Sequence, residues 1–364
     1  MQFGSQGKPP VGVIVDTDMG NSIDDVLALA LLYGLEGKDE TRLISVSVSK
    51  SSLDAAALCE VIGQFYAGSV NAGFASIRRT LPVGLSVEGR MPETTPMMKA
   101  VLERKNDDGS LAYKHGIANL NDTAEVPALL RNALTAQHDQ NAVVVLLGPA
   151  TNLARLLEVH GARELIAKKV RFLSLMGGAY PTGEPEFNIK ADIAAARKVF
   201  AEWPTPIVAS GFEVGNAIPY PGSAIETGFG WATAPHPVVD AYRGYQAMPY
   251  DTPSWDLTAA LHAVRPEGGF FQFSEPGTIT VENDGRTRFR ASADGKHRYL
   301  IVDPAQTERI VKTYVQLTTA KPVVKQRRFR RPPVEDPAKP PAKPADAPKT
   351  ESVKPAATNP REVQ

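Results

Sequence analysis

Four aspartates near the N-terminus are the residues of this chain best suited to chemistry. The segment VGVIVDTDMGNSIDDVLAL (11–29) carries Asp16, Asp18, Asp24 and Asp25 within ten residues. Two charges roughly 4 Å apart interact by about 4 kcal/mol at an effective dielectric of about 20. If these carboxylates are buried together they need a neutralising partner, and a hard divalent cation such as Ca²⁺ or Mg²⁺ prefers such oxygen donors. The simpler interpretation is an exposed turn with helix-capping acids, but caps account for one or two aspartates rather than four.

The segments on either side of the aspartates predict how they are positioned. The apolar run before Asp16 predicts a buried strand, and the apolar-periodic segment after Asp25 predicts a helix near residues 24–35. The loop is not an EF-hand, because its Gly is misplaced, the twelfth position lacks Glu and a strand precedes it. It is not a phosphate-binding P-loop either, because carboxylates repel phosphate and no Gly-Lys-Ser/Thr follows.

Strand-like and helix-like segments alternate along the chain. Continuous runs of Val, Ile and Leu between helices predict an α/β fold, an open and mostly parallel sheet with helices on both faces. Ligands bind such sheets outside the carboxyl ends of the strands. Asp18, Leu147 and Met176 fall at such ends, so we expect them around one crevice. The expected strands are residues 11–16, 42–49, 142–148, 170–178 and 205–211, and the expected helices lie near 24–35, 53–67, 191–203 and 254–264.

The later part of the chain is predicted to be less regular. Residues 212–253, rich in Gly, Pro and Tyr, predict long loops with a short helix near 236–246. Residues 277–303 alternate and contain Asp284-Gly285, which predicts a small C-terminal hairpin. A last helix is expected over 305–319.

The composition changes at the C-terminus. A basic run at 325–331 precedes 33 residues that contain nine prolines and no aromatic residue. Such a sequence has little to bury and predicts a disordered tail. We therefore expect an α/β domain at residues 8–322 and a Pro/Lys/Ala-rich tail at 323–364.

The composition of the whole chain narrows its class. Its 364 residues are 43% hydrophobic and carry a formal net charge of zero, so nothing favours nucleic acid as a partner. The single cysteine, Cys59, excludes an internal disulfide and is expected to pack in the core. No apolar stretch approaches the ~20 residues that span a membrane. The N-terminus lacks the apolar centre of a signal peptide, which leaves a cytoplasmic or an exported location open.

Four collinear segments resemble the calcium-dependent nucleoside hydrolases, the inosine-uridine-preferring family. LLGPATNLA (146–154) is similar to the family's Gly-Pro-Leu-Thr-Asn segment, and MGGAYPTGEPEFNIKADIAAA (176–196) to its Met-Gly-Gly loop, Glu-Phe-Asn and Asp-capped helix. SWDLTAALHAV (254–264) resembles the segment with the last metal carboxylate, and the Asp-rich loop resembles the first. The match covers roughly residues 11–320 and implies a Rossmann-like nucleoside hydrolase fold.

The resemblance implies a function and a set of site residues. The reaction is hydrolysis of the N-glycosidic bond of a ribonucleoside to ribose and free base, in nucleoside salvage. Ca²⁺ would be the cofactor, and Asp18 would be both a metal ligand and the general base toward a metal-bound water. We also expect a homo-oligomer, a dimer or a tetramer. The implied metal ligands are Asp18, Asp25, Asp256 and the carbonyl of Leu147, and the implied substrate contacts are Asp24, Asn21, Glu186, Asn188, Trp255 and Met176.

The chemistry of this reaction asks for these residue types. Glycosidic cleavage passes through an oxocarbenium-like state, whose positive charge nearby carboxylates balance. Water attack needs a metal to lower the pKa of the water and a base to accept its proton. Ca²⁺ takes six to eight oxygen ligands, so it can bind carboxylates, a carbonyl, water and ribose hydroxyls together.

The chain departs from the family pattern in four places. The first loop is longer by two residues between its Gly and the Asp pair. Trp255 stands where the family often has a His that can protonate a purine. Ser49-Lys50-Ser51 replaces the Gly-Asn pair usual after the second strand, and PTGEP lacks the Asn usual before Glu-Phe-Asn. The metal and ribose half of the site is therefore expected, whereas the base and the leaving-group acid stay open.

The candidates for that acid are few. The six histidines form no metal-spaced pair, and His115, His236 and His262 are candidates only by elimination. Tyr242, Tyr245 and Tyr250 lie in the predicted loops and could reach a base, although a phenol is a poor acid at neutral pH.

Two other functions compete with the nucleoside hydrolase. Asp16-Thr17-Asp18 after a strand fits the nucleophile motif of a haloacid-dehalogenase-like phosphatase, but that family wants its acidic pair in a separate segment. The second alternative is a nucleoside- or sugar-binding protein with a degenerate site that has lost turnover. Activity on p-nitrophenyl riboside and on p-nitrophenyl phosphate distinguishes the three.

Overall fold

The computed structural model describes residues 9–67, 81–87, 91 and 93–323, and these form a ten-stranded sheet with helices around it. The strand order is β3-β2-β1-β4-β5-β6-β10-β8-β9, and β7 pairs with β10. The pairs from β3 to β6 are parallel, as is β6 with β10, whereas β7, β8 and β9 pair in antiparallel fashion. The strands are β1 (Val11–Thr17), β2 (Thr41–Val48), β3 (Val83–Leu85), β4 (Ala142–Leu146), β5 (Val170–Met176), β6 (Ile207–Ser210), β7 (Gln272–Phe273), β8 (Gly277–Val281), β9 (Thr287–Ala291) and β10 (His297–Ile301).

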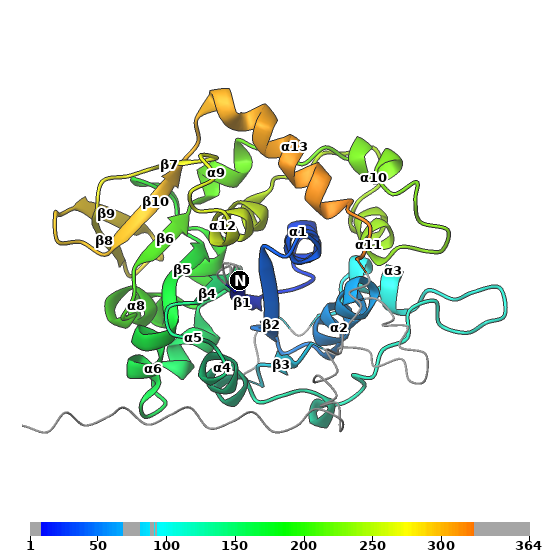
Figure 1. Cartoon of the computed structure of the whole chain (residues 1–364), viewed down its shortest axis with the longest axis horizontal. Coiled ribbons are helices and arrows are strands. Elements are labelled where there is room, and N and C mark those ends of the chain that lie inside the picture. Colours follow the sequence, from blue (N-terminus) through cyan, green and yellow to red (C-terminus); the bar gives the residue numbers. More distant parts are fainter. Residues whose placement is uncertain (1–8, 68–80, 88–90, 92, 324–364) are drawn as a thin grey trace, which may run out of the picture. The chain divides into compact units, whose positions relative to one another are not determined.

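Helices cover both faces of this sheet (Figure 1). Helices α1, α12 and α13 lie on one side of the parallel strands, and α4, α5, α6 and α8 lie on the other. The helices are α1 (Ile23–Gly37), α2 (Leu53–Ala67), α3 (Pro96–Leu102), α4 (Val126–Thr135), α5 (Thr151–Leu156), α6 (Ala162–Lys169), α7 (Phe187–Ala191), α8 (Ile193–Glu202), α9 (Phe212–Asn216), α10 (Ser223–Thr227), α11 (Pro237–Tyr245), α12 (Trp255–Val264) and α13 (Thr307–Thr318), with 3₁₀ turns at Leu120–Asp122 and Pro304–Gln306.

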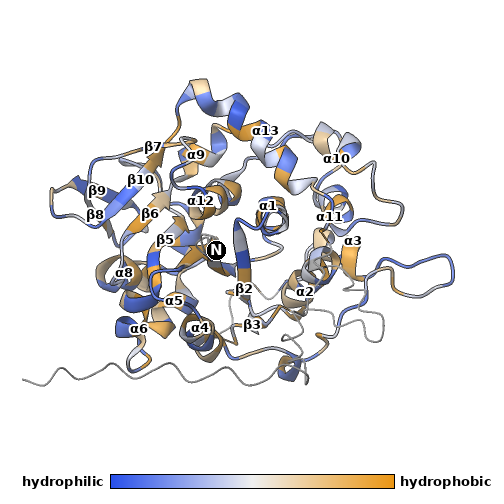
Figure 2. Cartoon of the chain, viewed as in Figure 1, coloured by the Kyte–Doolittle hydropathy of each residue, from blue (hydrophilic) through white to orange (hydrophobic). Residues whose placement is uncertain are grey.

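The central position of β1 in the sheet explains why its sequence is continuously apolar. Successive side chains of a strand point to opposite faces of a sheet. Val13 and Val15 pack into the core on the α1 and α12 side, whereas Ile14 packs into the core on the α4 and α8 side. Because both faces are buried, no position of the strand is left for a solvated polar residue. Figure 2 shows the same pattern, with hydrophobic colour on the central strands and hydrophilic colour on the β8–β9 hairpin.

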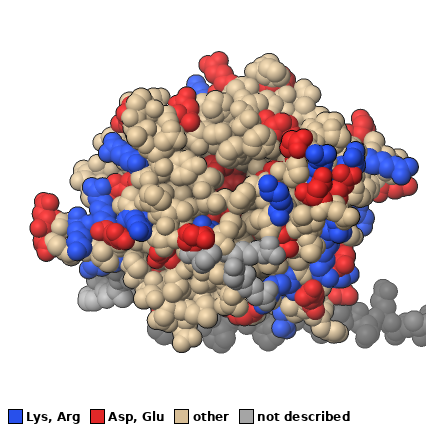
Figure 3. Space-filling model, turned by 180° about the vertical axis from the view of Figure 1, so that it is seen from behind, with Lys and Arg blue, Asp and Glu red and all other residues tan. Residues whose placement is uncertain are grey.

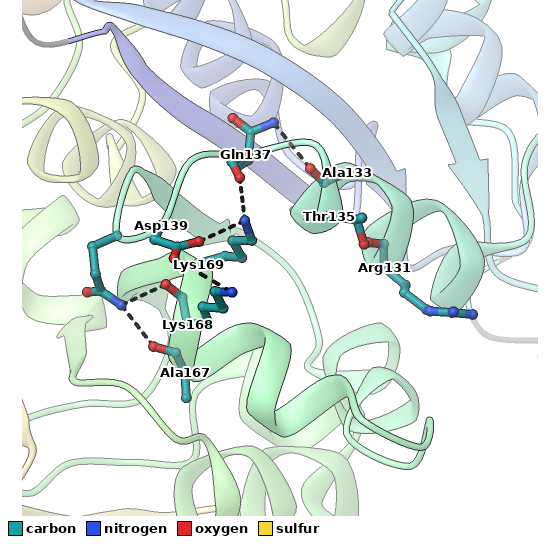
Figure 4. A network of polar contacts seen from close by, with 9 residues as sticks. Arg131, Ala133, Thr135, Gln137, Asp139, Ala167, Lys168 and Lys169 are labelled. Atoms are coloured by element: carbon teal, nitrogen blue, oxygen red, sulfur yellow. Dashed lines mark hydrogen bonds and ion pairs between the residues drawn. The ribbon is translucent and has the colours of Figure 1, made fainter.

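A polar network fastens the loop before β4 to the end of α6 (Figure 4). Asp139 pairs with Lys169 Nζ at 2.8 Å and with Lys168 Nζ at 3.8 Å. Lys169 Nζ also donates to the carbonyl of Gln137 at 2.7 Å. Lys169 directly precedes β5, so this network lies at the amino ends of the parallel strands, opposite to the end that carries Asp18.

The predicted α/β fold is confirmed, and the structure corrects parts of it. Residues 212–253 are largely loop, as predicted, but they contain the short helices α9 and α10 in addition to the predicted helix at α11. The predicted helix at 191–203 is shorter, because Asp192 ends α7 and caps α8 by accepting a hydrogen bond from Ala195 N. The hairpin turn at Gly285, with φ of +90°, is where it was predicted. The hairpin is not separate, however, since β10 joins the main sheet beside β6.

Some elements were not predicted, and part of the chain lies outside the described residues. Strand β3 and helices α3, α4 and α6 were not predicted, because their apolar segments are short or interrupted by polar residues. The predicted tail lies outside the described residues from residue 324 onward, as does residue 8 of the predicted domain. Cys59 is buried in α2, as expected.

Candidate active site

The Asp-rich loop is a tight turn from the end of β1 into the start of α1. Asp18 follows the last residue of β1, and Asn21 N donates to the carbonyl of Asp18 at 3.1 Å. Gly20 has a φ of +89°, a conformation that favours glycine. Asp24 and Asp25 then occupy the first turn of α1. Carboxylates are stabilised there by the positive end of the helix dipole.

Helix α12 brings the last aspartate to the same place. Asp256 lies in the first turn of α12, and its backbone N–H donates to Asp24 Oδ2 at 2.9 Å. Its side chain also shares a hydrogen bond with Asp25. Asp25 itself accepts hydrogen bonds from the Thr17 hydroxyl and, at 3.3 Å, from Ser22 N. Residues more than 230 positions apart are thereby joined in one carboxylate cluster, which we define as Asp18, Asp24, Asp25 and Asp256.

Leu147 is held beside Asp18 by the chain after β4. Its N–H donates to the carbonyl of Asp16 at 2.7 Å, and its own carbonyl accepts a hydrogen bond from Asn188 Nδ2 at 3.1 Å. Gly148 follows, and a Cβ there would lie 2.7 Å from Asp18 N and 2.9 Å from Ser49 Oγ. Only glycine therefore permits this close approach of the two loops.

The Glu-Phe-Asn segment is folded tightly against the end of β5. Glu186 caps α7, accepting hydrogen bonds from Asn188 N at 2.9 Å and from Gly178 N at 3.0 Å. Asn188 Nδ2 also contacts the carbonyl of Met176 at 3.3 Å. Glu186 and Asn188 thus lie next to Leu147 and Met176, as the strand-end argument predicts.

One cavity of about 140 Å³ unites these residues. A recess near the middle of the face in Figure 3 contains acidic side chains, and charges of both signs intermingle around it. Of the predicted site residues, Asp25 alone does not line the cavity. The lining residues are Asp18, Asn21, Ser22, Asp24, Leu147, Met176, Glu186, Phe187, Asn188, Phe212, Trp255 and Asp256.

Sequence reasoning missed three lining residues and one neighbour. Phe187, within Glu-Phe-Asn, was quoted but given no role, and Ser22 belongs to the lengthened loop. Phe212 had no signal in the sequence, and it stacks on Trp255 with centroids 5.5 Å apart and planes 24° apart. Trp255 Nε1 donates to the carbonyl of Phe212 at 3.2 Å, so the indole offers its faces rather than a free N–H. The missed neighbour is Lys50, which follows β2 and is buried.

Burial makes the carboxylate cluster electrostatically costly. Each of its side chains is at most 4% exposed. Burial, followed by the charge of Asp25, raises the pKa of Asp18 well above its usual value. Burial, followed by the charge of Asp24, raises the pKa of Asp25 to about 7. Burial and the three neighbouring aspartates raise the pKa of Asp256 well above its usual value. The cluster is therefore short of positive charge.

The cluster fits a calcium ion in donor type and burial. Three carboxylates and a backbone carbonyl are the oxygen donors that Ca²⁺ takes, and Asp18 Oδ2 is buried without a hydrogen-bond partner. As the side chains stand, however, no three His, Cys, Asp or Glu groups within residues 9–67, 81–87, 91 and 93–323 are arranged to hold a metal ion. The site therefore has the oxygen donors that Ca²⁺ needs, but their side chains do not point toward one common position.

Asp16 belongs to the scaffold of the loop rather than to the cavity. Its Oδ2 accepts hydrogen bonds from the Ser47 hydroxyl and, at 2.8 Å, from Asn152 Nδ2. Burial raises the pKa of Asp16 to about 7 although these two hydrogen bonds lower it. Thr151 Oγ1 donates to Asp192 at 2.6 Å. The Thr-Asn pair of the GPATN segment therefore ties α5 to β1 and to the start of α8.

The structure removes most candidates for a leaving-group acid. Among the described residues, no His or Tyr lines the cavity. Tyr242 and Tyr250 each donate their hydroxyl to the other's carbonyl, at 2.9 and 2.6 Å. His236 caps α11 through Nδ1 and lies buried among aromatic rings, and burial lowers its pKa to about 3.

A family model described as inosine-uridine preferring nucleoside hydrolase matches residues 13–323. The chain belongs to this family. The membership confirms the resemblance drawn from the four collinear segments. It overturns the phosphatase interpretation, which the position of the acidic pair already disfavoured.

Named relatives extend the comparison. The chain is 26% identical over 187 residues to the pyrimidine-specific ribonucleoside hydrolase RihB of Escherichia coli O157:H7 (strain EC4115 / EHEC). That alignment covers 50% of this chain and 58% of the curated relative, so it spans less than two thirds of the relative's length.

Solved nucleoside hydrolases share the fold over their whole length. A plant nucleoside hydrolase superposes with a TM-score of 0.63 and 20% identity, over 86% of this chain and 100% of that one. The purine-preferring ribonucleoside hydrolase from Gardnerella vaginalis superposes with a TM-score of 0.62 and 20% identity, over 85% and 99%. Within the described part of this nucleoside hydrolase family member, no helix has the length and apolar character to cross a membrane.

Proposed function

We propose that this chain hydrolyses the N-glycosidic bond of a ribonucleoside and releases ribose and the free base. The observation that carries the proposal is the cavity in which Asp18, Asp24 and Asp256 meet the Leu147 carbonyl, Glu186 and Asn188. A cavity lined by both carboxylates and aromatic rings suits a ligand with a hydroxylated sugar and a flat base.

The cofactor of this reaction is Ca²⁺, held by Asp18, Asp25, Asp256 and the carbonyl of Leu147. When bound, Ca²⁺ would supply the positive charge that lowers the pKa of the attacking water and attracts ribose hydroxyls. The burial of four carboxylates and the unpartnered Oδ2 of Asp18 support this assignment. Asp18 accepts the proton of the attacking water, because it lines the cavity and its Oδ2 has no hydrogen-bond partner among the described residues.

Three residues bind the ribose. Asp24, Glu186 and Asn188 line the same cavity as Asp18. The Glu186 oxygens accept backbone hydrogen bonds, which fix the carboxylate and leave lone pairs for sugar hydroxyls. Asn21 and Met176 complete the sugar contacts, and the carboxylates balance the positive charge that develops on the ribose.

The base binds against Trp255 and Phe212. Their stacked rings offer faces on which any nucleobase can lie. One of the similar hydrolases is pyrimidine-specific and another is purine-preferring, so these relatives favour neither class of base. The protein works as a homo-oligomer, a dimer or a tetramer, which light scattering tests. A cytoplasmic and an exported location are equally compatible with this reaction.

A nucleoside panel tests the function. Free ribose is measured by a reducing-sugar assay with and without EDTA, on inosine, adenosine, guanosine, uridine and cytidine. We expect ribose release from at least one nucleoside and its loss in EDTA. A protein that binds nucleosides but also leaves p-nitrophenyl riboside intact is the degenerate binding protein instead.

Metal analysis tests the cofactor separately. Protein purified without chelator should contain one divalent ion per chain, and Asp25→Ala should lose it and become less stable. The reason is that one ligand is gone while the remaining carboxylates still repel. Protein without any divalent ion would contradict the calcium assignment.

A further inference from the structure

Lys50 is a buried lysine in the segment that runs beside the start of the carboxylate cluster. The segment after β2 runs beside the segment after β1, because Ser49 N donates to the carbonyl of Thr17 at 2.9 Å. Lys50 is the next residue, and it is 2% exposed, one of the largest fully buried side chains in the described chain. Buried lysines are rare unless they are paired with opposite charge.

The surroundings of Lys50 supply that opposite charge. The positive charge of Lys50 lowers the pKa of Asp18 and of Asp25, against the larger raising effects of burial and like charge. Neither Lys50 nor Asp25 lines the cavity. Lys50 therefore lies near the cluster without facing the space that a substrate fills.

We propose that Lys50 is an internal counter-ion of the carboxylate cluster, which stabilises the metal-free protein and weakens its affinity for Ca²⁺. Only the part of this proposal that concerns Ca²⁺ affinity rests on the proposed function; the effect on the metal-free protein does not. A fixed ammonium group and a divalent cation compete for the same negative charge, so each reduces the stabilisation that the other provides. Lys50 acts here as a positioning and charge-balancing residue and does not touch the substrate.

Neutral and charged substitutions separate charge from packing. Lys50→Met keeps the length of the stem and removes the charge, Lys50→Gln is a second neutral variant, and Lys50→Arg keeps the charge. The matched control is Lys169→Met, which removes a largely buried lysine and its pair with Asp139 at the opposite end of the strands (Figure 4). All proteins are stripped with EDTA and dialysed.

The measurements are Ca²⁺ affinity by calorimetry and the melting temperature in EDTA. We expect the neutral variants to bind Ca²⁺ about 10–100-fold more tightly than the wild type, because one competing positive charge is gone. In EDTA they should melt at a lower temperature than Lys169→Met, and Ca²⁺ should restore more of their stability than it does for the wild type. Lys50→Arg should behave as the wild type. A neutral variant that folds only with Ca²⁺ supports the proposal as well.

Two results would overturn it. One is a Ca²⁺ affinity of both neutral variants within twofold of the wild type, together with a melting temperature in EDTA no lower than that of Lys169→Met. The other is a Lys50→Arg variant that behaves like Lys50→Met, because charge would then not be the cause. If no variant binds Ca²⁺, the calcium assignment fails, and a selective loss of stability in Lys50→Met still supports the counter-ion.

Discussion

The proposed function assigns Asp18 as the general base. Asp18 follows the end of β1, lines the cavity, and keeps Oδ2 free of hydrogen bonds within the described structure. By contrast, Asp24 accepts a hydrogen bond from Asp256 N. Asp25 accepts hydrogen bonds from the Thr17 hydroxyl and from Ser22 N. The free oxygen makes Asp18 the carboxylate best able to accept a proton.

We expect Asp18→Asn to lower kcat by about 10²–10⁴-fold, the usual contribution of a positioned general base. Substrate binding should change far less, because Asp24, Glu186 and Asn188 remain. Single-turnover kinetics and the dissociation constant of a nucleoside check this, with calcium content measured in parallel. A variant with wild-type kcat would show that another group is the base.

The described lining of the cavity contains no evident acid that could protonate the leaving base. The cavity lining offers Trp255 and the phenylalanines near the base, none of which gives up a proton at neutral pH. Of the three candidate tyrosines, only Tyr245 is affected by the charges of the site aspartates. Burial, followed by the charges of Asp24 and Asp25, raises the pKa of Tyr245, which makes it a poorer acid.

The enzyme should therefore hydrolyse p-nitrophenyl riboside faster than inosine, because nitrophenolate leaves without protonation. The ratio of the two kcat/KM values measures this dependence, and Tyr245→Phe should leave the ratio nearly unchanged. Equal values for both substrates would reveal an acid that the cavity lining does not contain. A fall in inosine hydrolysis in Tyr245→Phe would identify that acid.

At the scale of elements, two helix N-termini converge on the carboxylate cluster. Asp24 and Asp25 lie in the first turn of α1, and Asp256 lies in the first turn of α12. The positive ends of both helices offset part of the cost of burying these groups. The packing of α1 against α12 is therefore part of the site.

Helix α12 also carries a buried histidine that should make the fold sensitive to acid. His262 is 3% exposed and packs near Phe172 and Phe273, and burial lowers its pKa to about 4. An unfolded histidine titrates near 6.5. As the pH falls from about 6.5 toward 4, the unfolded chain takes up a proton that the native chain refuses, so stability is lost over this range.

His262→Phe keeps an aromatic ring and removes this titration. Its melting temperature should fall less between pH 7.5 and pH 5 than that of the wild type, as measured by circular dichroism. The exposed His138→Gln is the control and should follow the wild-type curve. Parallel curves for all three proteins would show that His262 does not contribute to the acid sensitivity.

At the scale of the whole chain, the family match stops before the basic and proline-rich C-terminal segment. The match ends at residue 323, which is also the last described residue. The chain beyond it holds a basic run and a stretch with nine prolines and no aromatic residue. Removing residues 325–364 should leave kcat/KM and the melting temperature nearly unchanged, because such a sequence has little to bury. A loss of many degrees on truncation would show that the tail contributes to stability.

The sequence by itself determined the sheet and the family. Strands such as β1 and β5 are continuous apolar runs, and turn signals such as Gly285 are local, so they can be recognised without long-range information. Four collinear motifs were enough for the family, because each keeps its residues within a short segment. The strand-end rule also placed Asp18, Leu147 and Met176 around one cavity before any contact was known.

Only the tertiary structure decided which distant side chains meet. Phe212 reaches the cavity because α9 packs beside α12, and Lys50 reaches the cluster because β2 lies next to β1. Tyr242, Tyr250 and His236 are engaged in hydrogen bonds of their own, which no spacing along the chain reveals. Local patterns follow from neighbouring residues, whereas these contacts depend on how the layers of helices pack on the sheet.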